Sequence, residues 1–224
     1  MLYAIVNNEK IEAKKGLTGK CPLCEQKLFP KCGEINIHHW SHYKNGSCES
    51  WYEPESEWHY HWKMTFGKDY TEVVLEKDGK KHFADIYTKN KVVIELQNSP
   101  ISKKIIRERE EFYGNKMLWI INGISFKERF EIKTENRYFE YDQKKRSYEI
   151  SKNLKKYLRF RWSYPKKSWE ESKRNIFFDF GDENLFWVEE GIDYGYGEGR
   201  YISKEAFIKK YGGNIKYYQE HFKR

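Results

Sequence analysis

Hydrophobic and polar positions alternate over the stretch 80–99, and this pattern predicts two short strands joined by a tight turn. In the second strand, one face carries Val92, Ile94 and Leu96 and the other carries Glu95 and Gln97. We expect the apolar face to pack against a core. The acidic face is then left for chemistry.

Asp85 of the first strand faces this acidic side if the turn is the three residues 89–91, with Asn90 in the left-handed conformation. Asp85 and Glu95 then lie opposite each other. Like charges held that close repel, and a divalent cation is the usual remedy. Their oxygen ligands suit Mg²⁺ or Mn²⁺, so the hairpin predicts a metal site. The alternative, commoner for two acids at this spacing, is a solvated acidic face.

The same kind of pattern predicts the elements around this hairpin. They are a hairpin at 2–13 turning at Asn7 and Asn8, a helix at 55–66 opened by Pro54, strands at 71–76 and 116–121, and a helix at 101–113. Further along, the sequence predicts a hairpin at 175–188, a flexible glycine-rich loop at 195–199, and a final helix capped by Ser203 and ending at Tyr211.

Three polar residues of the first predicted helix, Glu55, His59 and Lys63, are spaced four apart and share one face. Such a face is ordinarily solvated, but here it would look onto the carboxylates of the hairpin. Glu55 then becomes a further metal or water ligand, His59 a proton shuttle or phosphate contact, and Lys63 a phosphate contact. Glu57 competes with Glu55 as the acid of this helix, and Glu76 is a weaker candidate for the metal cluster.

Cysteine and histidine near the beginning of the chain predict a second metal site, because four cysteines in a chain without an evident secretory signal favour metal over disulfides. The predicted ligands are Cys21, Cys24, His39 and His42. Two thiolates and two imidazoles fit tetrahedral zinc, and four protein ligands make the site structural. His38 is the first spare ligand, and Cys32 and Cys48 are the others. A metal-free module with buried thiols is the alternative.

Composition adds a basic character to this picture. The 224 residues are 38% hydrophobic and 18% aromatic, with a net charge of +8. A basic chain favours an anionic partner, and the absence of an apolar run of membrane-spanning length favours DNA over a bilayer. The lack of an evident secretory signal favours a cytoplasmic location. We expect three parts, at 1–50, 51–123 and 124–224.

The stretch 151–174 carries nine Lys or Arg against two Glu, a local balance of +7. Lys155, Lys156 and Arg159 are candidates for phosphate contacts, and the interleaved Trp162 and Tyr164 are candidates for stacking on unpaired bases of single-stranded DNA. A solvated basic helix with a buried aromatic stripe is the alternative.

Several short motifs follow one another between residues 20 and 123. They are Cys21 with Cys24, His39 with His42, Glu55 to His59 with Lys63, Ala84-Asp85-Ile86, Glu95 to Ser99, Arg109 with Tyr113, and Trp119-Ile-Ile. In this sequence they resemble the PD-(D/E)XK nuclease superfamily and, within it, the competence protein CoiA-like family. The wider superfamily usually has Lys at the position of Gln97.

The resemblance implies an α/β (α+β) fold: a nuclease-like core of a mixed sheet flanked by helices, with an N-terminal zinc knuckle and a C-terminal α+β region. It implies metal-dependent hydrolysis of phosphodiester bonds in DNA, during uptake, recombination or mobile-element processing. Asp85 and Glu95 would hold Mg²⁺ or Mn²⁺, Gln97 would position the attacking water, and Glu55 would complete the cluster. The rival functions are a catalytically weak DNA-binding module of the same fold and a zinc-knuckle interaction protein.

Overall fold

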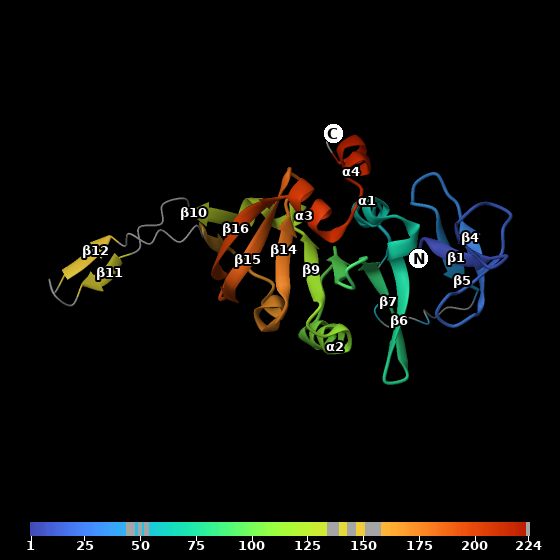
Figure 1. Cartoon of the computed structure of the whole chain (residues 1–224), viewed down its shortest axis with the longest axis horizontal. Coiled ribbons are helices and arrows are strands. Elements are labelled where there is room, and N and C mark those ends of the chain that lie inside the picture. The colour runs from blue at the N-terminus through green and yellow to red at the C-terminus, as the bar shows by residue number, and fades with distance from the viewer. Residues whose placement is uncertain are drawn as a thin grey trace.

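The computed structural model describes residues 1–43, 48, 51, 54–133, 139–142, 147–150 and 158–222. Their strands form an N-terminal sheet, a large central sheet, and a two-stranded hairpin of β11 (Phe139–Asp142) and β12 (Ser147–Ile150) (Figure 1). The large sheet is mixed and flanked by helices, which confirms the predicted fold class. Among the described residues, no helix combines the length and apolar character that crossing a bilayer requires.

The N-terminal sheet is antiparallel, with its strands in the order β2, β1, β3, β4, β5. The strands are β1 (Tyr3–Val6), β2 (Glu9–Glu12), β3 (Gly19–Lys20), β4 (Lys27–Lys31) and β5 (His39–His42). The predicted first hairpin is confirmed: Asn7 and Asn8 join β1 to β2 with φ of 50° and 67°. Asparagine tolerates the left-handed conformation that such a two-residue turn requires.

The large sheet runs in the order β10, β13, β16, β15, β14, β9, β8, β7, β6. Its strands are β6 (Thr71–Lys77), β7 (Lys80–Tyr87), β8 (Val93–Gln97), β9 (Met117–Asn122), β10 (Phe130–Lys133), β13 (Leu158–Trp162), β14 (Asn175–Asp179), β15 (Asn184–Asp193) and β16 (Tyr196–Ser203). The pairs β8–β9 and β9–β14 are parallel and the others antiparallel. Strand β9 is an almost continuous apolar run because, at the centre of the sheet, both of its faces are covered.

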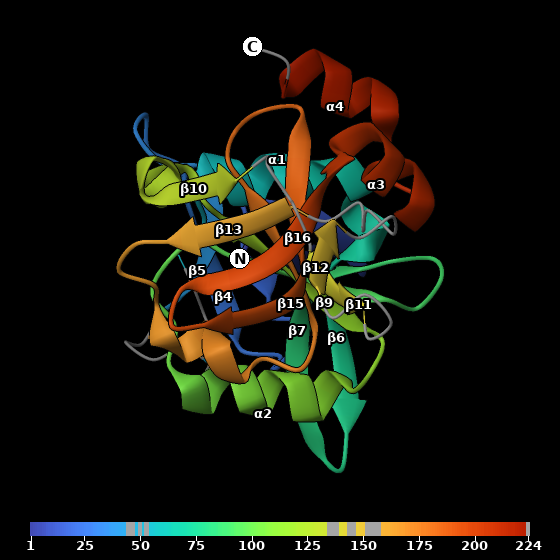
Figure 2. The ribbon, with the colours of Figure 1, turned by 90° about the vertical axis from the view of Figure 1, so that its left-hand side faces the viewer.

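Helices cover both faces of the large sheet (Figure 2). The helices are α1 (Glu57–Phe66), α2 (Lys103–Tyr113), α3 (Lys204–Tyr211) and α4 (Ile215–His221), with short 3₁₀ helices η1 (Lys68–Tyr70), η2 (Ile124–Arg129) and η3 (Lys167–Glu171). Ile106 of α2 packs into the core on one face. Trp62 of α1, Phe207 of α3 and Tyr218 of α4 pack into the core on the opposite face.

A buried carboxylate fixes the position of α1 on the sheet. Asp179, at the end of β14, accepts hydrogen bonds from the indole Nε1 of Trp58 (3.0 Å) and of Trp62 (2.9 Å). Its other oxygen lies 2.6 Å from Nζ of Lys204 in α3. Since a buried charge must be paired, this one residue ties α1 to the C-terminal strands and helices.

The central hairpin of β7 and β8 has the predicted register, with Ile86 opposite Ile94 around the turn 89–91. The left-handed residue of the turn is Lys91, with φ of 58°, and not Asn90. Its N–H donates to the carbonyl of Thr88 (2.8 Å), which closes a turn whose third residue must be left-handed. The expectation at Asn90 was therefore wrong by one position, without any change in strand pairing.

Several predicted elements differ from the structure, and two of the differences have a clear physical reason. Helix α1 begins at Glu57 because Ser56 caps it, accepting from the N–H of His59 (3.3 Å). The stretch 195–199 is not a loop, since it lies largely in β16. Gly199 is needed there because a Cβ would collide with the backbone oxygen of Trp187 in β15.

The strands after residue 123 extend the large sheet and share its cores. As predicted, β14 and β15 form a hairpin and Ser203 caps α3. Trp162 does not have the predicted exposed position. Its ring is 2% exposed and stacks on Phe126 at 4.5 Å, because β13 turns this side chain into the core. It is therefore unable to stack on a base.

We expect Trp162→Ala to lower the free energy of unfolding by about 3–5 kcal/mol, because it deletes a large buried ring. Tyr164, two residues away and 85% exposed, is the matched control, and Tyr164→Ala should change stability by no more than about 0.5 kcal/mol. Urea unfolding measures both. Equal stability of the two variants would contradict the burial of Trp162.

Candidate active site and metal centre

Strands β7 and β8 stop pairing at Ile86 and Ile94, and two carboxylates take over the hydrogen bonds beyond that point. The N–H of Asp85 donates to Oε1 of Glu95 (3.3 Å), and the N–H of Leu96 donates to Oδ2 of Asp85 (3.0 Å). Side-chain oxygens thus replace the carbonyl acceptors of a regular ladder. The result places Asp85 and Glu95 side by side where the strands separate.

Lys63 of α1 lies at the centre of an acidic cluster. Its Nζ is 2.8 Å from Oε2 of Glu55, 3.2 Å from Oε1 of Glu72 and 3.3 Å from Oδ1 of Asp85. Burial would lower the pKa of Lys63, but the three carboxylates outweigh it and hold the pKa well above its usual value. The side chain is 5% exposed, so Lys63 is an internal counter-ion and does not have the surface position that the predicted phosphate contact requires.

Glu55 is the acid that the structure places in this cluster, and Glu57 is exposed at the first turn of α1. Glu55 precedes the helix and is not part of it, so it reaches Lys63 from the segment ahead of the Ser56 cap. Its Oε1 is buried and accepts no hydrogen bond from the described residues. A buried carboxylate oxygen in this state is a candidate ligand for a cation.

Glu72 also belongs to the cluster, although the sequence pattern did not indicate it. The acid that the pattern indicated on this strand, Glu76, is exposed and pairs with Lys81. Glu72 has a φ of 48°, a conformation uncommon for a residue other than glycine, and β6 pairs with β7 on both sides of it. Its buried carboxylate accepts the N–H groups of Leu2 (2.9 Å to either oxygen) and Tyr3 (3.1 Å). An isolated strand pattern holds no signal for such a contact.

The pKa of Glu72 reports how strongly the cluster favours its charged form. Burial opposes ionisation, but Lys63, the amino group of Met1 and the N–H donors of Leu2 and Tyr3 outweigh burial. Together they lower the pKa from 4.5 to about 2. Glu72 is therefore ionised at neutral pH.

Glu95 has a counter-ion of its own. Its Oε2 lies 2.8 Å from NH1 of Arg109, a buried residue of α2. Lys63 and Arg109 thus relieve the repulsion between Asp85 and Glu95. Lys63 and Arg109 offset two of the four negative charges of Glu55, Glu72, Asp85 and Glu95, and the amino group of Met1 acts on Glu72 as a further positive charge. A divalent cation would offset the remaining negative charge, and carboxylate oxygens are the ligands that Mg²⁺ or Mn²⁺ prefers.

His59 and Gln97 are both buried beside the cluster. His59 contacts the carbonyl oxygen of Leu96 through Nε2 (3.2 Å) and Oγ of Ser56 through Nδ1 (2.8 Å). It links α1 to β8 and lacks the exposure of the predicted phosphate contact. Gln97 donates from Nε2 to the carbonyl oxygen of Ser99 (3.0 Å), at the end of the acidic strand.

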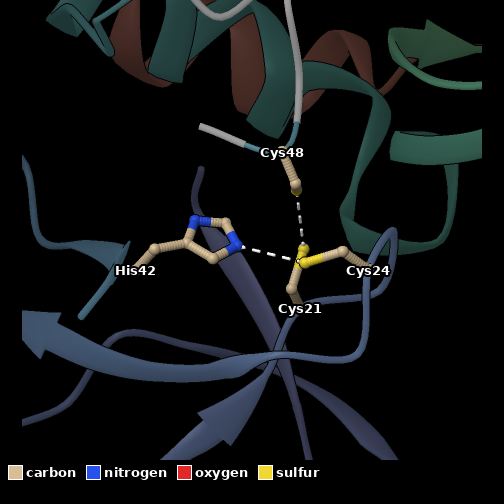
Figure 3. A group of neighbouring side chains, drawn as sticks. All are labelled: Cys21, Cys24, His42 and Cys48. Atoms are coloured by element: carbon tan, nitrogen blue, oxygen red, sulfur yellow. Dashed lines mark hydrogen bonds between the residues drawn. The ribbon is translucent and has the colours of Figure 1, made fainter. Parts of the chain in front are cut away.

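A second cluster lies at the N-terminal sheet and consists of Cys21, Cys24, His42 and Cys48 (Figure 3). One ligand atom from each residue lies within 4.8 Å of all the others. Sγ of Cys21 is 3.5 Å from Sγ of Cys48, and Sγ of Cys24 is 3.3 Å from Nε2 of His42. Burial raises the pKa of Cys21 and of Cys48, so a bound metal ion would be needed to hold them as thiolates. Three sulfurs and one imidazole fit tetrahedral zinc.

The prediction of His39 as a ligand was wrong, and Cys48 stands in its place. Side chains alternate along a strand, so His39 and His42, three residues apart in β5, point to opposite faces. Nδ1 of His39 instead contacts the carbonyl oxygen of Ile37 (2.9 Å). Of the three spare ligands, His38 was ranked first, but the structure brings only Cys48 into the cluster.

The structure describes only some of the residues predicted to bind DNA in the C-terminal part of the chain. Lys155 and Lys156 lie outside the described residues. Arg159 is exposed on β13, where its Nε is 3.4 Å from Oε1 of Glu198. Arg161 is exposed on the same strand, beside Tyr196 of β16. These side chains form a partly cationic face of the large sheet.

The central hairpin of the mixed sheet thus opens onto paired carboxylates, and a knuckle whose three cysteines and one histidine could bind zinc precedes it. Residues 57–176 match the nuclease-like domain of competence protein CoiA, and residues 4–50 match its N-terminal domain. The first match alone spans 120 of the 224 residues, so the chain belongs to the competence protein CoiA family. No curated protein and no solved structure gives a significant match.

Zinc content separates the observed ligand set from the predicted one. We expect about one equivalent of zinc per chain in the purified protein. Cys48→Ser should lose it because one thiolate is missing, and His39→Ala should retain it. Metal analysis after dialysis measures the content, with Cys32→Ser as the control outside the cluster. Zinc loss in His39→Ala together with retention in Cys48→Ser would reverse the assignment.

We expect low pH to remove the contribution of Glu72 to the stability of the folded protein. Because its pKa in the folded protein, about 2, lies below 4.5, the ionised group stabilises the fold above about pH 4.5, and this contribution is lost as the pH falls toward 2. Glu72→Gln should be less stable at pH 7 by on the order of 3 kcal/mol, because Lys63 loses a partner. Its stability should also change less between pH 5 and pH 3.

Urea unfolding across this pH range measures the difference. Glu76→Gln is the matched control, since Glu76 lies on the same strand but is exposed. If Glu72→Gln kept the pH dependence of the unaltered protein, Glu72 would not be the group that titrates.

Proposed function

We propose that this protein is a divalent-cation-dependent nuclease that hydrolyses phosphodiester bonds in DNA. The observation that carries the proposal is the pair Asp85 and Glu95, held side by side where β7 and β8 separate, within a domain of the nuclease-like CoiA family. The role in the cell that we propose is DNA processing during uptake, recombination or the movement of mobile elements.

In this proposal Asp85 and Glu95 hold Mg²⁺ or Mn²⁺, and Glu55 completes the site with its buried Oε1. The bound cation would supply Lewis acidity toward the phosphate and stabilise charge in the transition state. Gln97, on the same strand as Glu95, orients the attacking water, and a neutral amide does so without adding charge. Lys63 pairs with Asp85 and Arg109 pairs with Glu95, which reduces the repulsion between the two carboxylates.

DNA would be held outside the acidic cluster, because the cluster has a net negative charge and repels phosphates. We propose the cationic face of β13, with Arg159 and Arg161, as the described part of this surface, and Lys155 and Lys156 as its continuation along the chain. Single-stranded DNA is the first substrate to test.

A second candidate function is DNA binding without efficient cleavage. A specific observation favours it: Lys63 and Arg109 already pair with Asp85 and Glu95, so the carboxylates are neutralised without a metal ion. Gln97, at a position where the wider nuclease superfamily usually has Lys, also favours DNA binding without efficient cleavage. In this case the domain would use the fold as a DNA-binding scaffold.

We expect Asp85→Ala and Glu95→Ala each to abolish cleavage of DNA in the presence of Mg²⁺, because each removes a metal ligand. Both variants should bind DNA with nearly unchanged affinity, since the phosphate contacts lie elsewhere. Assays on single- and double-stranded DNA with Mg²⁺, Mn²⁺ and a chelator measure cleavage, and Glu76→Gln is the control acid. Unchanged cleavage in either alanine variant would remove the nuclease assignment, and binding without cleavage in the unaltered protein would favour the second candidate.

A further inference from the structure

The N-terminal module, residues 1–51, contacts the acidic cluster through the first residues of the chain. The N–H groups of Leu2 and Tyr3 both donate to the carboxylate of Glu72, which also pairs with Lys63. Nζ of Lys10, in β2, donates to the backbone oxygens of Thr71 and Glu72. The start of the module and the strand that carries Glu72 are therefore held together by buried polar contacts.

A second connection between the module and the acidic cluster is made by Trp51, at the end of the module. NH2 of Arg109 donates to the carbonyl oxygen of Trp51 (2.6 Å), and NH1 of the same guanidinium donates to Glu95 (2.8 Å). The Trp51 ring stacks on His82 of β7 at 3.4 Å, with an interplanar angle of 10°. One planar side chain thus joins the exit of the module to a carboxylate of the central hairpin.

Both connections begin next to ligands of the cysteine and histidine cluster. Tyr3 opens β1, which pairs with β3 through Ile5 and Lys20, and Lys20 directly precedes Cys21. Cys48 is three residues before Trp51 in the chain. In Figure 3, Cys48 reaches the cluster from a segment other than the N-terminal sheet, whose β3–β4 loop carries Cys21 and Cys24 and whose strand β5 ends at His42. A metal ion bound here would fasten these two segments to each other.

We infer that Glu72 and Arg109 are positioning residues that couple the two clusters, so that zinc bound by Cys21, Cys24, His42 and Cys48 strengthens divalent-cation binding at the acidic cluster. Zinc fixes Cys48 relative to Cys21, which restricts where Trp51 and Tyr3 lie. Arg109 and Glu72 then hold Glu95 and Lys63 in the arrangement that binds the cation. This inference rests on the proposed function, since it requires that the acidic cluster bind a cation.

Thermodynamic linkage makes the coupling measurable without any cleavage assay. If zinc strengthens Mg²⁺ binding by some factor, Mg²⁺ must strengthen zinc binding by the same factor. Mg²⁺ prefers oxygen ligands, so it does not compete for the thiolates. We expect the zinc affinity of the full-length protein, measured by competition with a chromophoric chelator at constant ionic strength, to rise at least about fivefold when Mg²⁺ is added.

Arg109→Lys is the critical variant. It keeps a positive charge for Glu95, but a single ammonium lacks the fork that reaches Glu95 and Trp51 together. We expect it to keep zinc and to lose the effect of Mg²⁺ on zinc affinity, so that the ratio falls to about one. Glu72→Gln should lower the ratio as well. Arg107→Lys, on the exposed side of the same helix, should keep the full effect.

The ratio of zinc affinities separates coupling from a general loss of stability, because destabilisation alone acts on both measurements equally. A ratio of one in the unaltered protein, or a full effect in Arg109→Lys, would overturn the inference. Direct titration with Mn²⁺, followed by electron paramagnetic resonance, shows whether the acidic cluster binds a cation at all. No Mn²⁺ binding would defeat the proposed function, whereas Mn²⁺ binding with a zinc ratio of one would defeat only the coupling.

Discussion

The buried ammonium of Lys63 is the interaction on which the centre of this protein depends. Glu55 comes from the segment before α1, Glu72 from β6 and Asp85 from β7, and each contacts the same Nζ. Burying three carboxylates together without a counter-ion would cost far more than folding supplies. Lys63 therefore holds α1, β6 and β7 together at one place. The N-terminal module is attached to the same place through Glu72.

The same interaction sets a limit on the chemistry. Lys63 and Arg109 neutralise only part of the negative charge of the acidic cluster. A cation would enter a site in which Asp85 and Glu95 already have counter-ions. The two functions that we propose, DNA cleavage and DNA binding without cleavage, would differ in how strongly a cation competes for Asp85 and Glu95. Its competitors are the ammonium of Lys63 and the guanidinium of Arg109.

The position of α1 shows how the C-terminal strands and helices support the helix that carries Lys63. Asp179 of β14 accepts from two indoles of α1, and Lys204 of α3 balances its charge. The strands after residue 123 therefore extend the central sheet and also support the helix that carries Lys63. Residue 124 is the predicted start of the C-terminal part, and the sheet continues across this position through the pairing of β14 with β9.

The sequence by itself determined those features of the protein that depend on residues close together in the chain. Turn length and alternation gave the register that sets Asp85 beside Glu95, and Cys21, Cys24 and His42 were found by spacing and residue type. Only the tertiary structure decided which distant groups complete each site. Glu72 reaches Leu2 and Tyr3 across about 70 residues, Cys48 replaces His39 because strand alternation turns His39 away, and Trp162 is buried under Phe126. Local patterns do not contain these contacts, because they form only when the sheet and its helices pack together.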